Sequence, residues 1–98
     1  MSWYKFERLG ARIMPVISRF FGILIFMFWR EHEPAHFHAK YGDEEATVEI
    51  ETGKITGSIS RRALALIQEW RELHKAELLE DWKLAGQRRE LNPVQPLE

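Results

Sequence analysis

The sequence predicts an α+β fold in which one long C-terminal helix packs on one face of a four-stranded antiparallel meander. Three observations support this prediction. An apolar run and three shorter segments separated by glycine-containing turns fill the middle of the chain, as in antiparallel sheets. Apolar residues then recur at helical spacing, with no proline or glycine between them. With 98 residues, 45% of them hydrophobic, the chain is long enough for one small domain with a thin core.

Three segments are expected along the chain. Residues 1–13 form an N-terminal extension, because they mix aromatic and cationic side chains without a clear period and precede an alternative start at Met14. Residues 14–86 form the single α+β domain. Residues 87–98 form an extended tail, because the two prolines in this segment disfavour a helix.

The most apolar stretch, residues 20–29, predicts a central strand. Its ten residues are too few to span a membrane, and its isoleucine and aromatic side chains favour a buried strand. No small-residue cleavage site follows, so we expect no signal peptide. The chain has no cysteine, which excludes a disulfide scaffold and cysteine metal sites. We therefore expect a cytoplasmic protein with no membrane partner.

A β-hairpin is predicted next. Residues 35–41 alternate between apolar and polar side chains, and the Gly-Asp pair at residues 42–43 is typical of a two-residue turn. The turn sets a register that pairs Ala35 with Ile50, His36 with Glu49, Phe37 with Val48, His38 with Thr47, Ala39 with Ala46 and Lys40 with Glu45. The apolar residues then share one face, and His36, His38 and Lys40 lie on the other, which we expect to be solvated.

The fourth strand and the helix complete the predicted fold. A turn at residues 52–53 is expected to pair Glu51 with Lys54, Ile50 with Ile55 and Ala46 with Ile59. Ser60 is a good N-cap for a helix over residues 61–85, which Gly86 ends. A bend is expected near His74, and the apolar stripe of the helix should cover the apolar sheet face.

The densest group of chemically active side chains is the segment HEPAHFH at residues 32–38. It contains the letters H-E-x-x-H, which mark a zinc protease when both histidines lie on one face of a helix. Pro34 lies between the two histidines and disfavours a helix there. We therefore exclude the zinc-protease interpretation.

His36 and His38 are the candidate catalytic and metal-binding residues, because alternate residues of a strand share a face. Two imidazoles at this spacing can bind a divalent metal, with Glu49 across the hairpin or His32 on the preceding loop nearby. They can instead act as a general acid and a general base. The alternative is a solvated sheet face on which His36 simply pairs with Glu49.

The charge balance excludes a protein that coats nucleic acid through bulk positive charge. The chain has 14 Lys and Arg against 15 Asp and Glu, a net charge of −1. A local patch remains open: Lys40, Arg61 and Arg62 are candidate binding residues, together with His32 and Glu49. The alternative is a solvated face of mixed charge, because glutamates share it.

Several motifs together resemble the bacterial domain of unknown function 4160 family. They are MPVIS at 14–18, EHEPAHFHA at 31–39, YGDEEA at 41–46, RRAL at 61–64, EW at 69–70 and LHKAELLEDW at 73–82. The resemblance covers about residues 14–98. One departure is Ala35, where the family more often has a second proline.

The resemblance implies a biological setting rather than a reaction. No activity is firmly assigned to the family, and its genes often lie beside those of another small family, domain of unknown function 2442, in a layout similar to a toxin–antitoxin pair. It therefore implies one component of a two-protein module with a small bacterial partner protein. If this chain is the toxin of such a module, His36 and His38, with the nearby Arg61, are expected to act on RNA by acid–base chemistry; the resemblance leaves open whether it is the toxin or the antitoxin. The alternatives are a metal-binding protein or sensor that uses the HEPAHFH histidines, and a non-catalytic regulatory domain or homodimer.

Overall fold

The structure, a computed structural model, describes residues 6–9 and 12–98. Its elements are β1 (Phe6–Leu9), β2 (Arg12–Phe20), β3 (Ile23–Phe26), β4 (His36–Tyr41), β5 (Glu44–Glu49), β6 (Ile55–Ser58) and α1 (Arg61–Gly86). The predicted extension over residues 1–13 lies partly outside the described residues. Where it is described, residues 6–9 form β1 and residues 12–13 begin β2.

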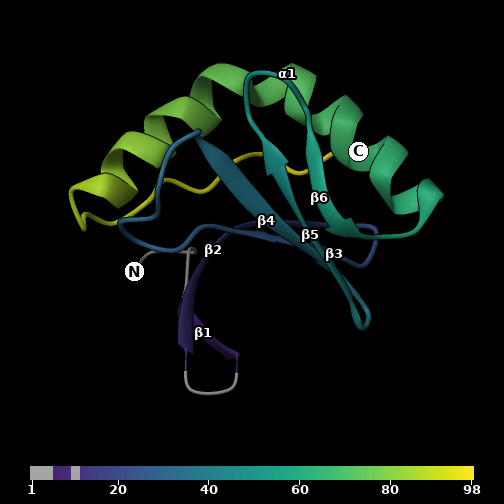
Figure 1. The fold of residues 1–98 in the computed structure, drawn as a ribbon, viewed down its shortest axis with the longest axis horizontal. Coiled ribbons are helices and arrows are strands. Elements are labelled where there is room, and N and C mark those ends of the chain that lie inside the picture. Colours follow the sequence, from purple (N-terminus) through teal and green to yellow (C-terminus); the bar gives the residue numbers. More distant parts are fainter. Residues whose placement is uncertain (1–5, 10–11) are drawn as a thin grey trace.

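Every strand runs antiparallel to its neighbours, in the order β1-β2-β3-β4-β5-β6 (Figure 1). Strands β2 to β6 form a continuous five-stranded sheet, and β1 pairs with the first residues of β2. In the described part of the chain, the α+β class, the antiparallel sheet and the C-terminal helix are confirmed. The prediction of a four-stranded sheet is wrong, because β2 adds a strand beside β3.

The additional strand was hidden by a turn inside the apolar run. Residues 20–29 contain the end of β2, a turn and the whole of β3, rather than one strand. Phe21 and Gly22 form the turn with φ values of 50° and 81°, the left-handed conformations of a hairpin turn. A register shift between Val16 and Ser18 also breaks the alternation of β2, so the strand has no clean period in the sequence.

The two hairpins that follow differ in how well local sequence predicts them. The register of β4 against β5 is confirmed at every pair that the strands form. The register of β5 against β6 is wrong by two residues, because Ile55 pairs with Val48 rather than with Ile50. An even shift leaves each side chain on its predicted face. The shift lengthens the loop, in which the Gly53 backbone N–H donates to the Glu49 carbonyl at 2.9 Å.

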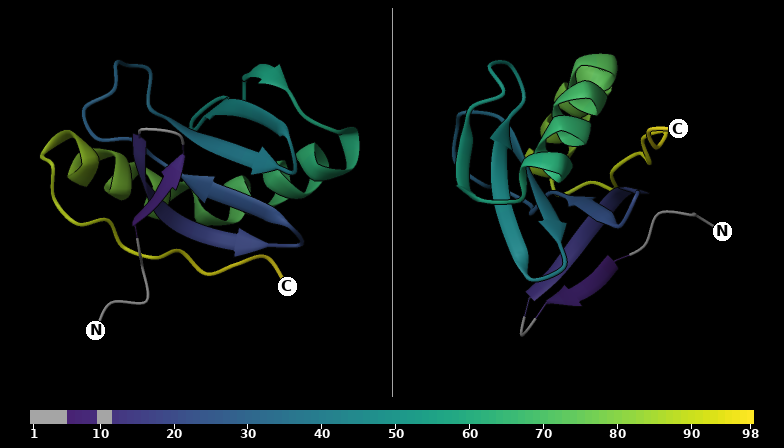
Figure 2. Two further views of the ribbon diagram at one scale, coloured as in Figure 1. Left: turned by 90° about the horizontal axis from the view of Figure 1, so that it is seen from below. Right: turned by 90° about the vertical axis from the view of Figure 1, so that its right-hand side faces the viewer.

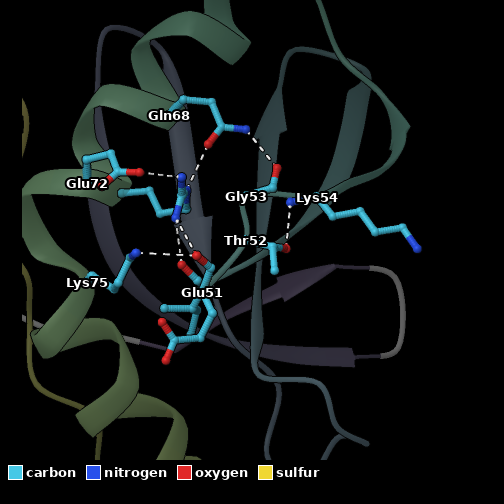
Figure 3. Close-up of polar contacts among 9 residues, drawn as sticks. Glu51, Thr52, Gly53, Lys54, Gln68, Glu72 and Lys75 are labelled. Atoms are coloured by element: carbon cyan, nitrogen blue, oxygen red, sulfur yellow. Dashed lines mark hydrogen bonds and ion pairs between the residues drawn. The ribbon is translucent and has the colours of Figure 1, made fainter.

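Contacts with α1 explain the longer loop (Figure 3). The buried Arg71 donates to the Ile50 carbonyl at 2.7 Å and pairs with Glu72 at 2.7 Å. The side-chain amide of Gln68 donates to the Gly53 carbonyl at 2.8 Å. Gly53 has a φ of +78°, and a Cβ at this position would lie 2.8 Å from atoms of Arg71 and Gln68. These contacts hold the longer loop against the helix, and the left-handed φ of Gly53 favours glycine in the loop.

Helix α1 crosses one face of the sheet, and the main core lies between them (Figures 1 and 2). Phe37 and Val48 of the sheet and Ile67 and Trp70 of the helix are fully buried. The predicted bend is confirmed at His74, whose φ of −122° and ψ of 22° are not helical. In the described part of the chain, no helix is long and apolar enough to cross a membrane.

The tail lies alongside β2 and completes the core (Figure 2). Residues 89–98 contain neither helix nor strand. Leu91 and Val94 are buried, and the Val94 N–H donates to the Ile17 carbonyl at 2.8 Å. The Trp70 indole donates to the Gln95 carbonyl at 2.9 Å. These contacts attach the extended segment to both the sheet and the helix.

Candidate metal centre

Three side chains converge at the start of β4. His36 and His38 lie on the sheet face opposite α1, with ring centroids 5.3 Å apart. Glu31, from the loop between β3 and β4, places its Oε1 atom 3.2 Å from His36 Nε2 and 2.7 Å from His38 Nε2. One ligand atom from each of the three residues lies within 4.8 Å of the other two. These residues are referred to below as the Glu31 cluster.

The loop that carries Glu31 is held against the C-terminal end of α1. The Arg30 backbone N–H donates to the Ala85 carbonyl at 3.2 Å. The Trp82 indole donates to the Glu33 carboxylate at 3.2 Å. Trp82 also lies against His36, with ring centroids 5.0 Å apart. The helix therefore positions both the carboxylate and one imidazole.

The hydrogen bond of His36 fixes its tautomer. Its Nδ1 lies 2.8 Å from the carbonyl oxygen of Pro34. A carbonyl only accepts, so Nδ1 carries the proton and donates. Neutral His36 therefore presents the lone pair of Nε2 to Glu31. Metal-bound histidines are oriented in the same way, with one ring nitrogen donating to a carbonyl and the other free to bind.

His38 is buried among aromatic side chains, which corrects the prediction of a solvated face. Its ring stacks on Phe26 at 5.2 Å and meets Phe28 edge-on at 4.8 Å, and the residue is 8% exposed. Nε2 donates to Glu31, whereas Nδ1 has no hydrogen-bond partner among the described residues. The nearest carboxylate oxygen recorded for Nδ1 is Oε2 of Glu45, at 3.9 Å.

Electrostatics keep Glu31 anionic. Burial raises the pKa of this carboxyl group, but the hydrogen bond from His38 and the charges of His38 and His36 outweigh burial and lower the pKa below its usual value. In the neutral form of His36, the Nε2 lone pair faces this anionic oxygen at 3.2 Å, so the space between the two atoms accepts a proton or a metal ion.

A recess adjoins the cluster. It encloses about 120 Å³, and its walls include Phe28, Arg30, Glu31, Glu33 and Trp82. Glu31 belongs to both the recess and the cluster, and Trp82 of the recess wall contacts His36, so the recess adjoins the cluster although neither histidine lines it.

The other predicted site residues do not belong to the cluster, although Glu49 lies opposite His36 in the hairpin and His32 follows Glu31 in the chain. His32 is exposed, and Glu49 accepts a hydrogen bond from Thr52 at 2.9 Å. Lys40 donates to the Gly42 carbonyl at 2.8 Å in the hairpin turn.

The two predicted arginines are also distant from the cluster. Arg61 and Arg62 are exposed in the first turn of α1. The cluster contacts Trp82, near the other end of the helix and roughly 30 Å away at 1.5 Å per residue.

Sequence reasoning did not assign to the site Glu31, Glu45 and Trp82, which contact the predicted histidines, or Phe26 and Phe28, which bury His38. Glu31 directly precedes the HEPAHFH segment, and this closeness in sequence was the one indication that it belongs to the site. Its contact with both histidines depends on how the loop before β4 folds back, which the alternation of apolar and polar residues does not predict.

No curated protein and no solved structure matches the chain. The model of the family described as a domain of unknown function (DUF4160) matches residues 22–83, a segment that includes the Glu31 cluster and Trp82. The matched segment is more than half of the chain. The protein therefore belongs to the DUF4160 family.

Proposed function

We propose that this protein binds one divalent transition-metal ion through Glu31, His36 and His38. The observation that carries the proposal is the convergence of two imidazole Nε2 atoms on one carboxylate oxygen, at 3.2 and 2.7 Å. Ligand atoms about 2.1 Å from a metal lie about 3.0 Å apart at right angles and about 3.4 Å apart at tetrahedral angles. Small movements of these side chains therefore suffice to accept an ion.

The donor set also fits such an ion. Two histidines and one carboxylate hold zinc in hydrolytic enzymes and iron in non-haem oxygenases. Three protein ligands leave at least one coordination position for water or a small molecule. A site of this kind supports catalysis or sensing, whereas structural zinc sites are closed by a fourth protein ligand.

His38 Nδ1, which has no hydrogen-bond partner among the described residues, supports the same proposal. Binding of a metal at Nε2 moves the ring proton to Nδ1, which now becomes a donor. Glu45 Oε2 lies 3.9 Å from this atom, so a small rotation of the Glu45 side chain forms the hydrogen bond. A carboxylate that accepts from a metal-bound histidine is a common arrangement around zinc.

The surrounding charges favour a cation over a phosphodiester. Glu33 and Glu45 lie near the cluster, together with Arg30 in the wall of the adjoining recess. Lys40 lies opposite Glu45 in the hairpin, and Arg61 and Arg62 lie in the first turn of α1. Acid–base cleavage of RNA by His36 and His38 stays a prediction, as does the two-protein module with a DUF2442 partner. Metal binding has the stronger geometric support.

Metal titration tests the proposal directly. Tag-free protein, stripped with a chelator, is titrated with Zn²⁺ and Mn²⁺ by calorimetry. We expect one ion per chain in the wild type and no binding in the His36→Ala/His38→Ala variant. His32→Ala is the matched control, because it removes an exposed histidine of the same motif and should leave binding intact.

Circular dichroism and thermal unfolding of each variant show whether the fold is retained. Equal binding by the wild type and a folded double variant would overturn the proposal, as would the absence of stoichiometric binding in the wild type.

A further inference from the structure

The recess beside the Glu31 cluster has the size of a pocket for a small organic molecule. Its volume of about 120 Å³ is close to the roughly 150 Å³ of an engineered protein cavity that binds benzene. Glu31 belongs to both the recess and the cluster, and Trp82 of the recess wall contacts His36, with ring centroids 5.0 Å apart. The recess therefore adjoins the place where the proposed metal would be held.

The walls of the recess are of two chemical kinds. Phe28 and Trp82 provide aromatic surface, and Arg30 provides a guanidinium group. Arg30 forms no ion pair or side-chain hydrogen bond with any described residue. Its backbone is fixed by the hydrogen bond to Ala85 at 3.2 Å. A guanidinium that no described residue pairs with, beside an aromatic wall, suits a carboxylate with a short apolar body.

The charge of the recess depends on the metal. Glu31 and Glu33 outweigh Arg30 by one negative charge, so the metal-free recess repels anions. A divalent ion reverses the balance to one positive charge. Anion binding is therefore coupled to metal binding, and the coupling favours a ligand with a single negative charge.

From these contacts we infer that the recess binds a small monocarboxylate. Its carboxylate bridges the metal and the Arg30 guanidinium, and its apolar part lies against Phe28 and Trp82. The inference rests on the proposed metal site. By thermodynamic linkage, the carboxylate must strengthen metal binding by the same factor by which the metal strengthens carboxylate binding.

The test measures Zn²⁺ affinity by calorimetry in the presence of millimolar propionate or of propionamide, its neutral analogue of similar shape. We expect propionate to strengthen Zn²⁺ binding by about fivefold or more in the wild type, and propionamide to have no effect. Arg30→Gln should bind Zn²⁺ but lose the propionate effect. Arg88→Gln is the matched control, because Arg88 is also exposed, has a similar φ of 56° and does not line the recess.

Two outcomes overturn the inference while metal binding survives: equal affinities in propionate and propionamide, or an equal gain in Arg30→Gln. Absence of Zn²⁺ binding under every condition overturns the proposed function and the carboxylate site with it. A propionate effect that Arg30→Gln abolishes and Arg88→Gln preserves supports the carboxylate site.

Discussion

The buried carboxyl group of Asp81 makes the stability of this protein depend on pH. Asp81 lies on α1 and is fully buried. Its Oδ1 accepts a hydrogen bond from the Asn92 backbone at 2.7 Å, and its Oδ2 has no partner among the described residues. Burial, together with the charges of Glu77 and Glu80, outweighs the Asn92 hydrogen bond and raises the pKa of Asp81 from 3.8 to about 7.

The direction of the effect follows from proton linkage. The raised pKa means that the folded state binds more protons than the unfolded state between about pH 3.8 and pH 7, so stability falls as the pH rises through this window. Each pKa unit corresponds to 1.36 kcal/mol, so the rise costs about 4 kcal/mol of unfolding free energy above pH 7. This cost is a large part of the 5–15 kcal/mol that is typical of small domains.

Asp81→Asn removes the titration and keeps the oxygen that accepts from Asn92. We expect the stability of the variant relative to the wild type to rise by about 3 kcal/mol between pH 5 and pH 8. Urea unfolding followed by tryptophan fluorescence at several pH values measures this difference. Other titrating groups cancel because both proteins share them.

Glu69→Gln provides the control, since it removes an exposed carboxylate from the same helix and should follow the wild type across the pH range. Parallel pH profiles for wild type and Asp81→Asn would refute the reasoning. They would mean that Asp81 ionises in the folded protein as easily as in the unfolded chain.

Three further predictions concern the site and the fold. Glu45→Gln should weaken Zn²⁺ binding by about 10-fold or more, because it weakens the hydrogen-bond acceptor for His38 Nδ1. Glu49→Gln is the control on the same face of β5 and should bind Zn²⁺ like the wild type. Equal Zn²⁺ affinities of the two variants by calorimetry would contradict the role of Glu45 as this acceptor. Gly53→Ala should destabilise the fold by about 1–3 kcal/mol, since the loop needs a left-handed φ and the new Cβ would displace the Arg71 and Gln68 side chains from their hydrogen bonds. An unchanged thermal unfolding midpoint would show that the loop and these side chains adjust without cost. If the protein is the toxin of a two-protein module and its histidines perform the chemistry, induced expression of the chain alone should arrest bacterial growth. A folded His36→Ala/His38→Ala variant should then not arrest growth. Arrest by both proteins would show that the toxic activity depends on other residues.

Local sequence predicted those parts of the fold that local interactions determine. The β4–β5 hairpin was predicted pair by pair because its turn and its alternation agree on one register. The β5–β6 register was missed because it depends on Arg71, a helix residue that binds the loop carbonyl of Ile50. The turn at Phe21 was missed because an apolar side chain occupies a left-handed position that usually favours glycine or asparagine.

The candidate site was likewise predicted only where local sequence determines it. Alternation along β4 predicted that His36 and His38 share a face. It did not predict that this face is partly covered, because the aromatic residues that bury His38 come from β3 and the segment after it. Glu31 was missed because the carboxylate expected beside the histidines lay across the hairpin, whereas the loop before β4 folds back to supply a closer one.

Adjacent residues of α1 connect the site to the stability of the fold. Asp81 holds the tail through Asn92, and Trp82 contacts the metal-site loop through Glu33 and His36. Metal at 100 times its dissociation constant stabilises a folded protein by about 2.7 kcal/mol, which is comparable with the cost of ionising Asp81. Both effects act on the helix segment beyond the bend at His74. If the proposed metal site is occupied, its binding energy offsets, at neutral and alkaline pH, part of the loss of stability that ionised Asp81 causes.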